Sequence, residues 1–235
     1  MNIFTRTFLT PVLDFIYPPV CFTCNRMLAE GETRVCNRCW GSFVRVTPDH
    51  PIWQEIEQRL SGEIRLSGLV SSYLFEKNSR LSEVIHLLKY SGIKSLGTKL
   101  GREIGDRFEE WNLTRGIDYL IPVPLHPLKK RERGYNQAEI IARGISEVTR
   151  IPVDASFLVR KKYTASQTRL DRSQRLENVA GAFAVRQTRM MDAADRSFVL
   201  VDDVITTGAT IGACMKILKS LGAAGVYASS VALAQ

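Results

Sequence analysis

Two adjacent carboxylates stand where a buried strand is expected to end. Residues 198–210 read FVLVDDVITTGAT, so Asp202 and Asp203 follow four apolar residues directly. A buried carboxylate needs a partner, because an ionised group without one is costly to desolvate. Neutral sugar hydroxyls or a metal ion would supply that partner. The pair therefore marks a candidate ligand site.

The loop after these carboxylates has the composition of a phosphate site. Its backbone N–H groups and the start of the next helix would attract an anion. Glycine allows close approach of the backbone, and threonine hydroxyls add donors. The expected phosphate-binding residues are Thr206, Thr207, Gly208, Ala209 and Thr210. Because the two acids repel a phosphate, we expect them to face a vicinal diol, and the combination predicts a ribose 5-phosphate ligand. The other interpretation is a strand end with a polar turn.

Four of the five cysteines form a second candidate site. Their spacing is CxxC, eleven residues, CxxC, which suits a tetrahedral zinc ion with four thiolate ligands. The segment has too little apolar content to fold alone, so metal binding would supply much of its folding energy. Disulfides would need an oxidising compartment, and a redox CxxC would come once rather than twice. The predicted structural zinc ligands are Cys21, Cys24, Cys36 and Cys39.

The remaining metal-binding residue types give weaker signals. Cys214 falls on the apolar stripe of an expected helix, so we place it in the core. The histidines His50, His86 and His126 have no ligand spacing. A second metal site made from them is not expected.

Positive charge is concentrated in the middle of the chain. The formal net charge is +8, and residues 126–175 contain 12 Lys or Arg against 5 Asp or Glu, a net +7. Such localised charge attracts phosphates or nucleic acid, although a solvated basic face would have the same composition. Tyr135, Tyr163 and Trp40 are candidate platforms for stacking the bases of single-stranded DNA.

No apolar run reaches the roughly 20 residues that a transmembrane helix needs. Residues 1–20 are apolar, but Thr10, Pro11 and Asp14 interrupt them, and they lack the basic start and cleavage site of a signal peptide. We expect a short helix packed in the core; a peripheral contact at the inner face of the membrane is the other interpretation. These features favour a cytoplasmic protein.

Strands and helices are expected to alternate and to hold these residues in place. The expected strands cover residues 68–76, 118–126, 197–203 and 225–234. The expected helices cover residues 79–92, 95–112, 136–150 and 210–223. This order favours an α/β fold with a doubly wound, mostly parallel sheet, in which ligands bind beyond the carboxyl ends of the strands. The expected domains are a zinc-ribbon-like module at 1–45, a linker with about one helical turn at 46–66, and an α/β domain at 67–235.

Residues 198–210 resemble the phosphoribosyl pyrophosphate signature of type I phosphoribosyltransferases, which combines apolar residues, two acids and a Thr-Thr-Gly loop. With IPVPLHPLKKRERGYNQAEIIA, TRLDRSQRLENVAGAF and the YPPVCFTC knuckle, the chain resembles the ComF family of competence-related proteins from about residue 12 to 234. The resemblance implies a phosphoribosyltransferase-like domain at 67–235 after the zinc module. It also implies that Asp202, Asp203 and the 206–210 loop bind phosphoribosyl pyrophosphate with Mg²⁺.

The resemblance implies two alternative functions. In the first, the chain binds phosphoribosyl pyrophosphate or a related ribose phosphate together with single-stranded DNA, and acts with the DNA-uptake machinery in natural transformation. In the second, it is an active phosphoribosyltransferase of nucleotide or nucleoside metabolism without a DNA role. The sequence identifies no acceptor pocket and leaves turnover open. The residues expected to contact pyrophosphate or DNA are Lys129, Lys130, Arg131, Arg133, Arg169, Arg172 and Arg175.

Overall fold

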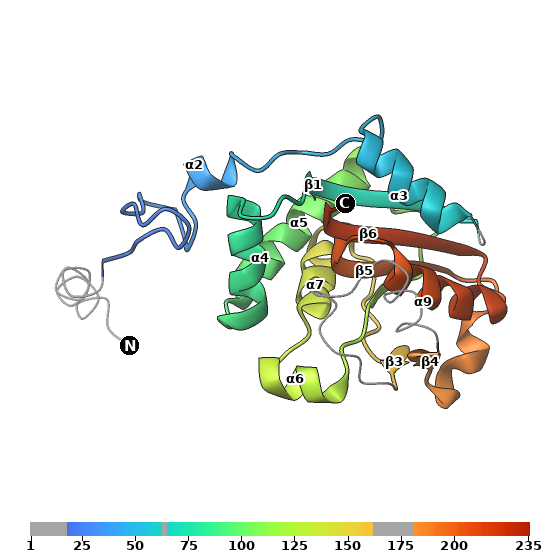
Figure 1. Cartoon of the computed structure of the whole chain (residues 1–235). Coiled ribbons are helices and arrows are strands. Elements are labelled where there is room, and N and C mark those ends of the chain that lie inside the picture. Colours follow the sequence, from blue (N-terminus) through green and yellow to red (C-terminus); the bar gives the residue numbers. More distant parts are fainter. Residues whose placement is uncertain (1–17, 63–64, 162–180) are drawn as a thin grey trace.

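Four parallel strands form the centre of the molecule (Figure 1). The computed structural model describes residues 18–62, 65–161 and 181–235. In spatial order the strands are β1 (Gly68–Leu74), β6 (Gly225–Leu233), β5 (Ser197–Ile205) and β2 (Tyr119–Pro122). The last strand of the chain therefore lies inside the sheet, beside the strand that carries the two carboxylates. The predicted mostly parallel sheet is confirmed.

Helices cover both faces of this sheet (Figure 1). On β5, Val199 and Val201 belong to one hydrophobic cluster and Phe198 and Leu200 to another, as the alternation of a strand requires. The first cluster includes α4 (Arg80–Tyr90), α5 (Lys94–Glu110) and α7 (Gln137–Thr149). The second includes α3 (Pro51–Ser61) and α9 (Ala209–Ser220). The predicted doubly wound arrangement is thus confirmed.

Glycines bring α5 and α7 into backbone contact. A Cβ added to Gly101 would overlap the carbonyl oxygen of Ile141 and lie 2.9 Å from the Cα of Gly144. Gly97 and Gly105 lie one helical turn to either side of Gly101, and a Cβ on either would also be crowded by α7. This close crossing fixes the position of α5 relative to α7, and both helices contribute to the first hydrophobic cluster.

Three features of the fold add to the sequence-based expectation. The expected linker at 46–66 contains α3, an 11-residue helix whose Ile52, Trp53, Ile56 and Leu60 are buried. A further helix that is not among the expected ones, α6 (Pro127–Arg133), follows β2. The strand β3 (Leu158–Arg160), which precedes residues 162–180, pairs antiparallel with β4 (Phe183–Val185), which follows them. The shorter elements are α2 (Asn37–Trp40) and the 3₁₀ helix η2 (Gln187–Ala193).

Two histidines have structural roles in these unexpected helices. The Nδ1 of His50 accepts a hydrogen bond from the N–H of Ile52 at 3.2 Å, and that of His126 accepts one from Leu128 at 3.3 Å. Each histidine thereby caps a helix that begins with proline, where free N–H groups need an acceptor.

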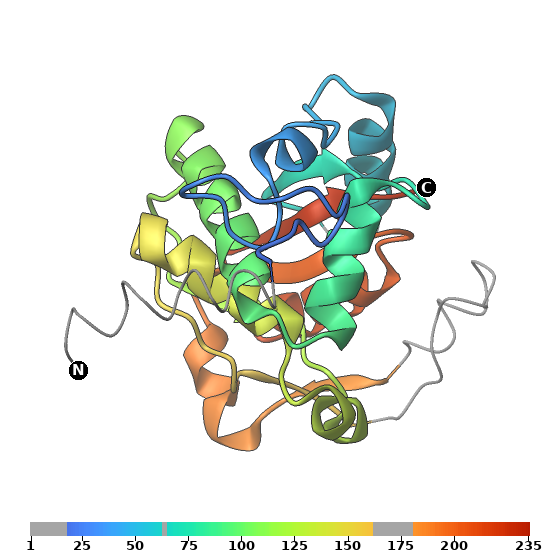
Figure 2. The ribbon, with the colours of Figure 1, turned by 90° about the vertical axis from the view of Figure 1, so that its left-hand side faces the viewer.

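The cysteine-bearing module packs against α4 and α5, as the rotated view shows (Figure 2). The indole N–H of Trp40 and the hydroxyl of Tyr73 both donate to Glu103 of α5. Residues 1–17, where a short N-terminal helix was expected, lie outside the described part of the chain. No helix in the described ranges combines the length and the apolar character that crossing a membrane requires.

Candidate functional site

Both carboxylates line an open cavity of about 300 Å³ beyond the carboxyl end of β5. Asp203 is buried and Asp202 is half-buried. The backbone N–H of Asp203 donates to Oδ1 of Asp202 at 2.8 Å, and the N–H of Val204 donates to Oδ1 of Asp203 at 2.9 Å. These local hydrogen bonds fix the orientation of both carboxyl groups at the cavity wall.

The loop between β5 and α9 forms another part of the lining of the same cavity. Gly208 has a φ of 77° and precedes the first residue of α9, Ala209. A side chain would be strained at this φ, and a Cβ there would also lie 2.8 Å from Leu60 of α3. The residues predicted to bind a phosphate all line the cavity: Thr206, Thr207, Gly208, Ala209 and Thr210. The structure therefore brings the two carboxylates and the 206–210 loop together around one cavity.

Basic side chains from three other elements complete the wall. Lys89 comes from α4, Lys129 and Arg133 from α6, and Arg160 from β3. Burial, followed by repulsion from Arg160 and Arg133, lowers the pKa of Lys129. An anionic ligand would offset this repulsion between the cationic side chains. The cavity thus has a surplus of cationic groups beyond the two carboxylates.

Lys89 is ion-paired with the buried carboxylate. Its Nζ lies 2.5 Å from Oδ2 of Asp203. Burial alone would raise the pKa of Asp203. The charge and hydrogen bond of the Lys89 ammonium, together with the hydrogen bonds involving Asp202 and the N–H of Val204, hold that pKa below its usual range. Burial, and then the negative charge of Asp203, raise the pKa of Asp202 to about 8. The two neighbouring acids are therefore inequivalent, because the pKa of Asp203 is lowered and that of Asp202 is raised.

The predicted basic contacts divide into three groups. Lys129 and Arg133 line the cavity. Lys130 lies 4.0 Å from Glu139 and, like Arg131, is outside the cavity lining. The remaining three lie outside the described residues: Arg169, Arg172 and Arg175. Sequence reasoning missed Lys89 and Arg160, whose positions become apparent only when α4 and β3 are placed beside β5.

The two candidate stacking residues that the structure describes already make contacts within the fold. Tyr135 is buried, and its hydroxyl donates to the carbonyl of Leu88. The ring of Trp40 is covered by Lys99, whose Nζ lies 3.9 Å from the ring centroid. Tyr163 lies outside the described residues. At the cavity rim, Tyr90 is exposed instead, and no pattern in the sequence distinguishes it from a core residue of α4.

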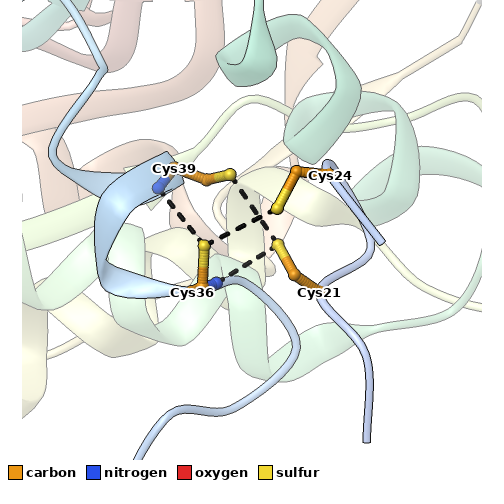
Figure 3. Close-up of side chains that lie close together, drawn as sticks. All are labelled: Cys21, Cys24, Cys36 and Cys39. Atoms are coloured by element: carbon orange, nitrogen blue, oxygen red, sulfur yellow. Dashed lines mark hydrogen bonds between the residues drawn. The ribbon is translucent and has the colours of Figure 1, made fainter. Parts of the chain in front are cut away.

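The four predicted zinc ligands converge on one point (Figure 3). The Sγ atoms of Cys21 and Cys39 lie 3.8 Å apart, and those of Cys24 and Cys36 are also 3.8 Å apart. Four thiolates at about 2.3 Å from a tetrahedral zinc ion would lie about 3.8 Å from one another. A disulfide would need sulfurs at about 2 Å. The cluster therefore fits zinc and leaves no open coordination position.

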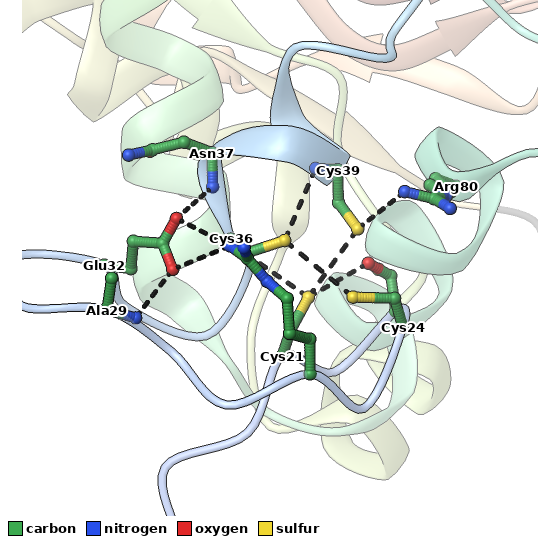
Figure 4. A network of polar contacts seen from close by, with 10 residues as sticks. Cys21, Cys24, Ala29, Glu32, Cys36, Asn37, Cys39 and Arg80 are labelled. Carbon is green, nitrogen blue, oxygen red and sulfur yellow. Dashed lines mark hydrogen bonds and ion pairs between the residues drawn. The ribbon is translucent and has the colours of Figure 1, made fainter.

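Donors from neighbouring groups surround the sulfurs (Figure 4). The N–H of Cys36 donates to Sγ of Cys21 at 3.3 Å, and Nη1 of Arg80, at the start of α4, donates to Sγ of Cys39 at 2.9 Å. Glu32 accepts from the N–H groups of Ala29 and Asn37 and thereby ties the loop between the two CxxC pairs. Such outer contacts orient thiolate ligands and offset their negative charge.

Comparison with known proteins places the chain in a family. A family model described as a double zinc ribbon domain matches residues 12–50, which confirms the predicted module and supports structural zinc. Competence protein F of Haemophilus influenzae is 35% identical over 67% of this chain and 63% of its own length. DNA utilization protein YhgH of Escherichia coli K12 is 30% identical over 89% of this chain and 94% of its own length. Competence protein ComFC of Bacillus subtilis is 24% identical over 89% of this chain and 82% of its own length.

A more distant likeness exists among solved structures. A purine phosphoribosyltransferase from Pyrococcus horikoshii matches 57% of this chain and 71% of its own chain, at 20% identity and a TM-score of 0.35. The identity and coverage of the curated relatives decide the family: the chain belongs to the ComF family of competence-related proteins.

Proposed function

We propose that this chain binds phosphoribosyl pyrophosphate, or a related ribose phosphate, in the cavity at the end of β5. The observation that carries the proposal is the meeting of two carboxylates, an anion-binding loop and several cations around one cavity. Carboxylates accept hydrogen bonds from a vicinal diol, and the loop at 206–210 donates to a phosphate. Lys129, Arg133 and Arg160 would then face the pyrophosphate.

A thermal-shift experiment tests this assignment. A ligand that binds only the folded state stabilises it by about 2.7 kcal/mol at one hundred times its Kd, so phosphoribosyl pyrophosphate with Mg²⁺ should raise the Tm of the parent protein. The Asp202→Asn/Asp203→Asn variant should lose that increase. Asp106→Asn, on the exposed side of α5, is the matched control and should keep it. An unchanged Tm in the parent would refute the proposal.

We further propose that the chain handles single-stranded DNA during DNA uptake, together with the uptake machinery. Two relatives are named competence proteins and one a DNA utilization protein, and the cavity rim carries a structural feature that suits a nucleobase. Tyr90 is exposed, and the guanidinium of Arg133 lies 5.3 Å from its ring centroid. An aromatic ring beside a cation is typical of sites that stack bases without reading their sequence.

Turnover is the alternative to binding alone. The cationic wall would stabilise a departing pyrophosphate if a nitrogen nucleophile displaced it from the ribose. Release of pyrophosphate from phosphoribosyl pyrophosphate in the presence of a nucleobase would favour an active transferase. Binding without release would favour a sensor or carrier role for the same cavity.

A further inference from the structure

The ammonium of Lys89 lies against Oδ2 of Asp203, a carboxylate oxygen that could otherwise bind a divalent cation. The Nζ–Oδ2 distance is 2.5 Å, and the two side chains are only 26% and 7% exposed. The contact joins two different layers of the fold, since Lys89 comes from α4 and Asp203 from the end of β5. The ion pair is thus built by the packing of a helix on the sheet.

The carboxyl group of Asp202 offers a metal ion little attraction beyond that of Asp203. Mg²⁺ is held by protein through one or two ionised carboxylates at about 2.0–2.1 Å. Asp203 is already neutralised by Lys89, and Asp202 binds a proton more readily than an ordinary aspartate. A divalent cation at this point would also stand beside an ammonium ion, and like charges that close repel strongly in a partly buried site. The donor set therefore fits a sugar diol better than it fits magnesium.

We infer that Lys89 takes the place of a divalent cation at Asp203, so that Asp202, Asp203 and Lys89 recognise the ribose hydroxyls with no metal ion between protein and sugar. The inference deepens the proposed function and rests on it for the identity of the sugar. Any magnesium in the complex would then arrive with the pyrophosphate. Lys89 thereby contributes to sugar specificity, because its ammonium can donate a hydrogen bond to a ligand oxygen while it stays paired with Asp203.

Ribose 5-phosphate is the informative ligand because it has the diol and the phosphate but no pyrophosphate to carry a metal. Its Kd for the zinc-loaded protein, measured by calorimetry in resin-treated buffer, should change by less than about twofold on addition of Mg²⁺. Lys89→Met should weaken binding by about tenfold or more, the size expected when a hydrogen bond to a charged group is lost. Lys77→Met, at an exposed position outside the cavity lining, is the control. Binding by the parent protein that requires Mg²⁺ would overturn the inference.

Metal binding without any sugar gives an independent readout. The probe is Mn²⁺ and the measurement is electron paramagnetic resonance. The parent and the Asp203→Asn variant should bind the same number of Mn²⁺ ions. Lys89→Met should gain a Mn²⁺ site, and the double variant with Asp203→Asn should lose it again. A Mn²⁺ site in the parent that depends on Asp203 would refute the role of Lys89. If no ribose phosphate binds to the parent, the proposed function fails, while the Mn²⁺ experiment still decides what Lys89 does.

Discussion

At the scale of single residues, the most informative group is Asp202. Burial, and then its neighbour Asp203, raise its pKa to about 8, whereas an aspartate in the unfolded chain titrates near 4. Between these two pH values the folded state holds a proton that the unfolded state does not. The contribution of Asp202 to the free energy of unfolding is therefore full below about pH 4 and declines as the pH rises to about 8.

Replacing this carboxyl with an amide should remove that decline. In urea titrations of the ligand-free protein between pH 5 and 8, Asp202→Asn should gain stability relative to the parent as the pH increases. Asp106→Asn, which is exposed, should follow the parent at every pH. Parallel curves for Asp202→Asn and the parent would contradict the prediction.

Tyr90 gives a second prediction at this scale. It is 66% exposed, more than any other large hydrophobic residue that the structure describes, and its ring lies 4.6 Å from that of His86. Tyr90→Ala should weaken the binding of a single-stranded oligonucleotide, because stacking contributes about 1–3 kcal/mol per base. Tyr90→Phe should retain the affinity, and the salt dependence should be the same for both variants since no phosphate contact changes. Fluorescence anisotropy measures both quantities; equal affinity of Tyr90→Ala and the parent would exclude this platform.

At the scale of elements, the crossing of α5 and α7 depends on the absence of side chains. Gly101→Ala would push a methyl group into the carbonyl of Ile141, and overpacking of this kind costs about 1–3 kcal/mol. Gly212 of α9 is the matched control, because a Cβ there meets nothing within 4 Å. Gly212→Ala should stabilise the protein by up to about 1 kcal/mol through helix propensity. Chemical denaturation should thus give opposite signs for the two substitutions, and equal effects would contradict the packing argument.

The apolar character of each element explains whether it could be predicted from the sequence. The strands β5 and β6 are long, mostly apolar and largely buried on both faces, and such segments can be recognised without knowledge of the fold. By contrast, α3 begins at Pro51, three residues after Pro48, and has mixed polarity, so its four buried side chains were not evident. Lys89 and Arg160 were missed for a related reason, since a single cation on a helix or short strand carries no signal until its neighbours are known.

At the scale of the whole molecule, α4 joins the two candidate sites. Arg80 at its first turn donates to Sγ of Cys39 at 2.9 Å, and Lys89 near its last turn pairs with Asp203 at 2.5 Å. Between them, Leu81, Val84, Ile85 and Leu88 are buried in the cluster that also contains Cys21, Cys36 and Cys39. The zinc centre and the ligand cavity therefore share one helix and one hydrophobic core, although the sequence suggests two separate domains.

Removal of zinc should consequently affect more than the module that holds it. Thiolates without their metal would repel or protonate. The contacts of Cys39 with Arg80 and of Trp40 with Glu103, which tie the module to the larger domain, would be lost along with the local fold. We expect a chelator to lower the temperature of the main calorimetric transition, because buried residues of the module and of α4 belong to a single cluster. The same chelator saturated with zinc is the control. If the main transition stayed in place and only a small early transition disappeared, the module would be an independent domain, and the shared core would contribute little to the stability of the cavity.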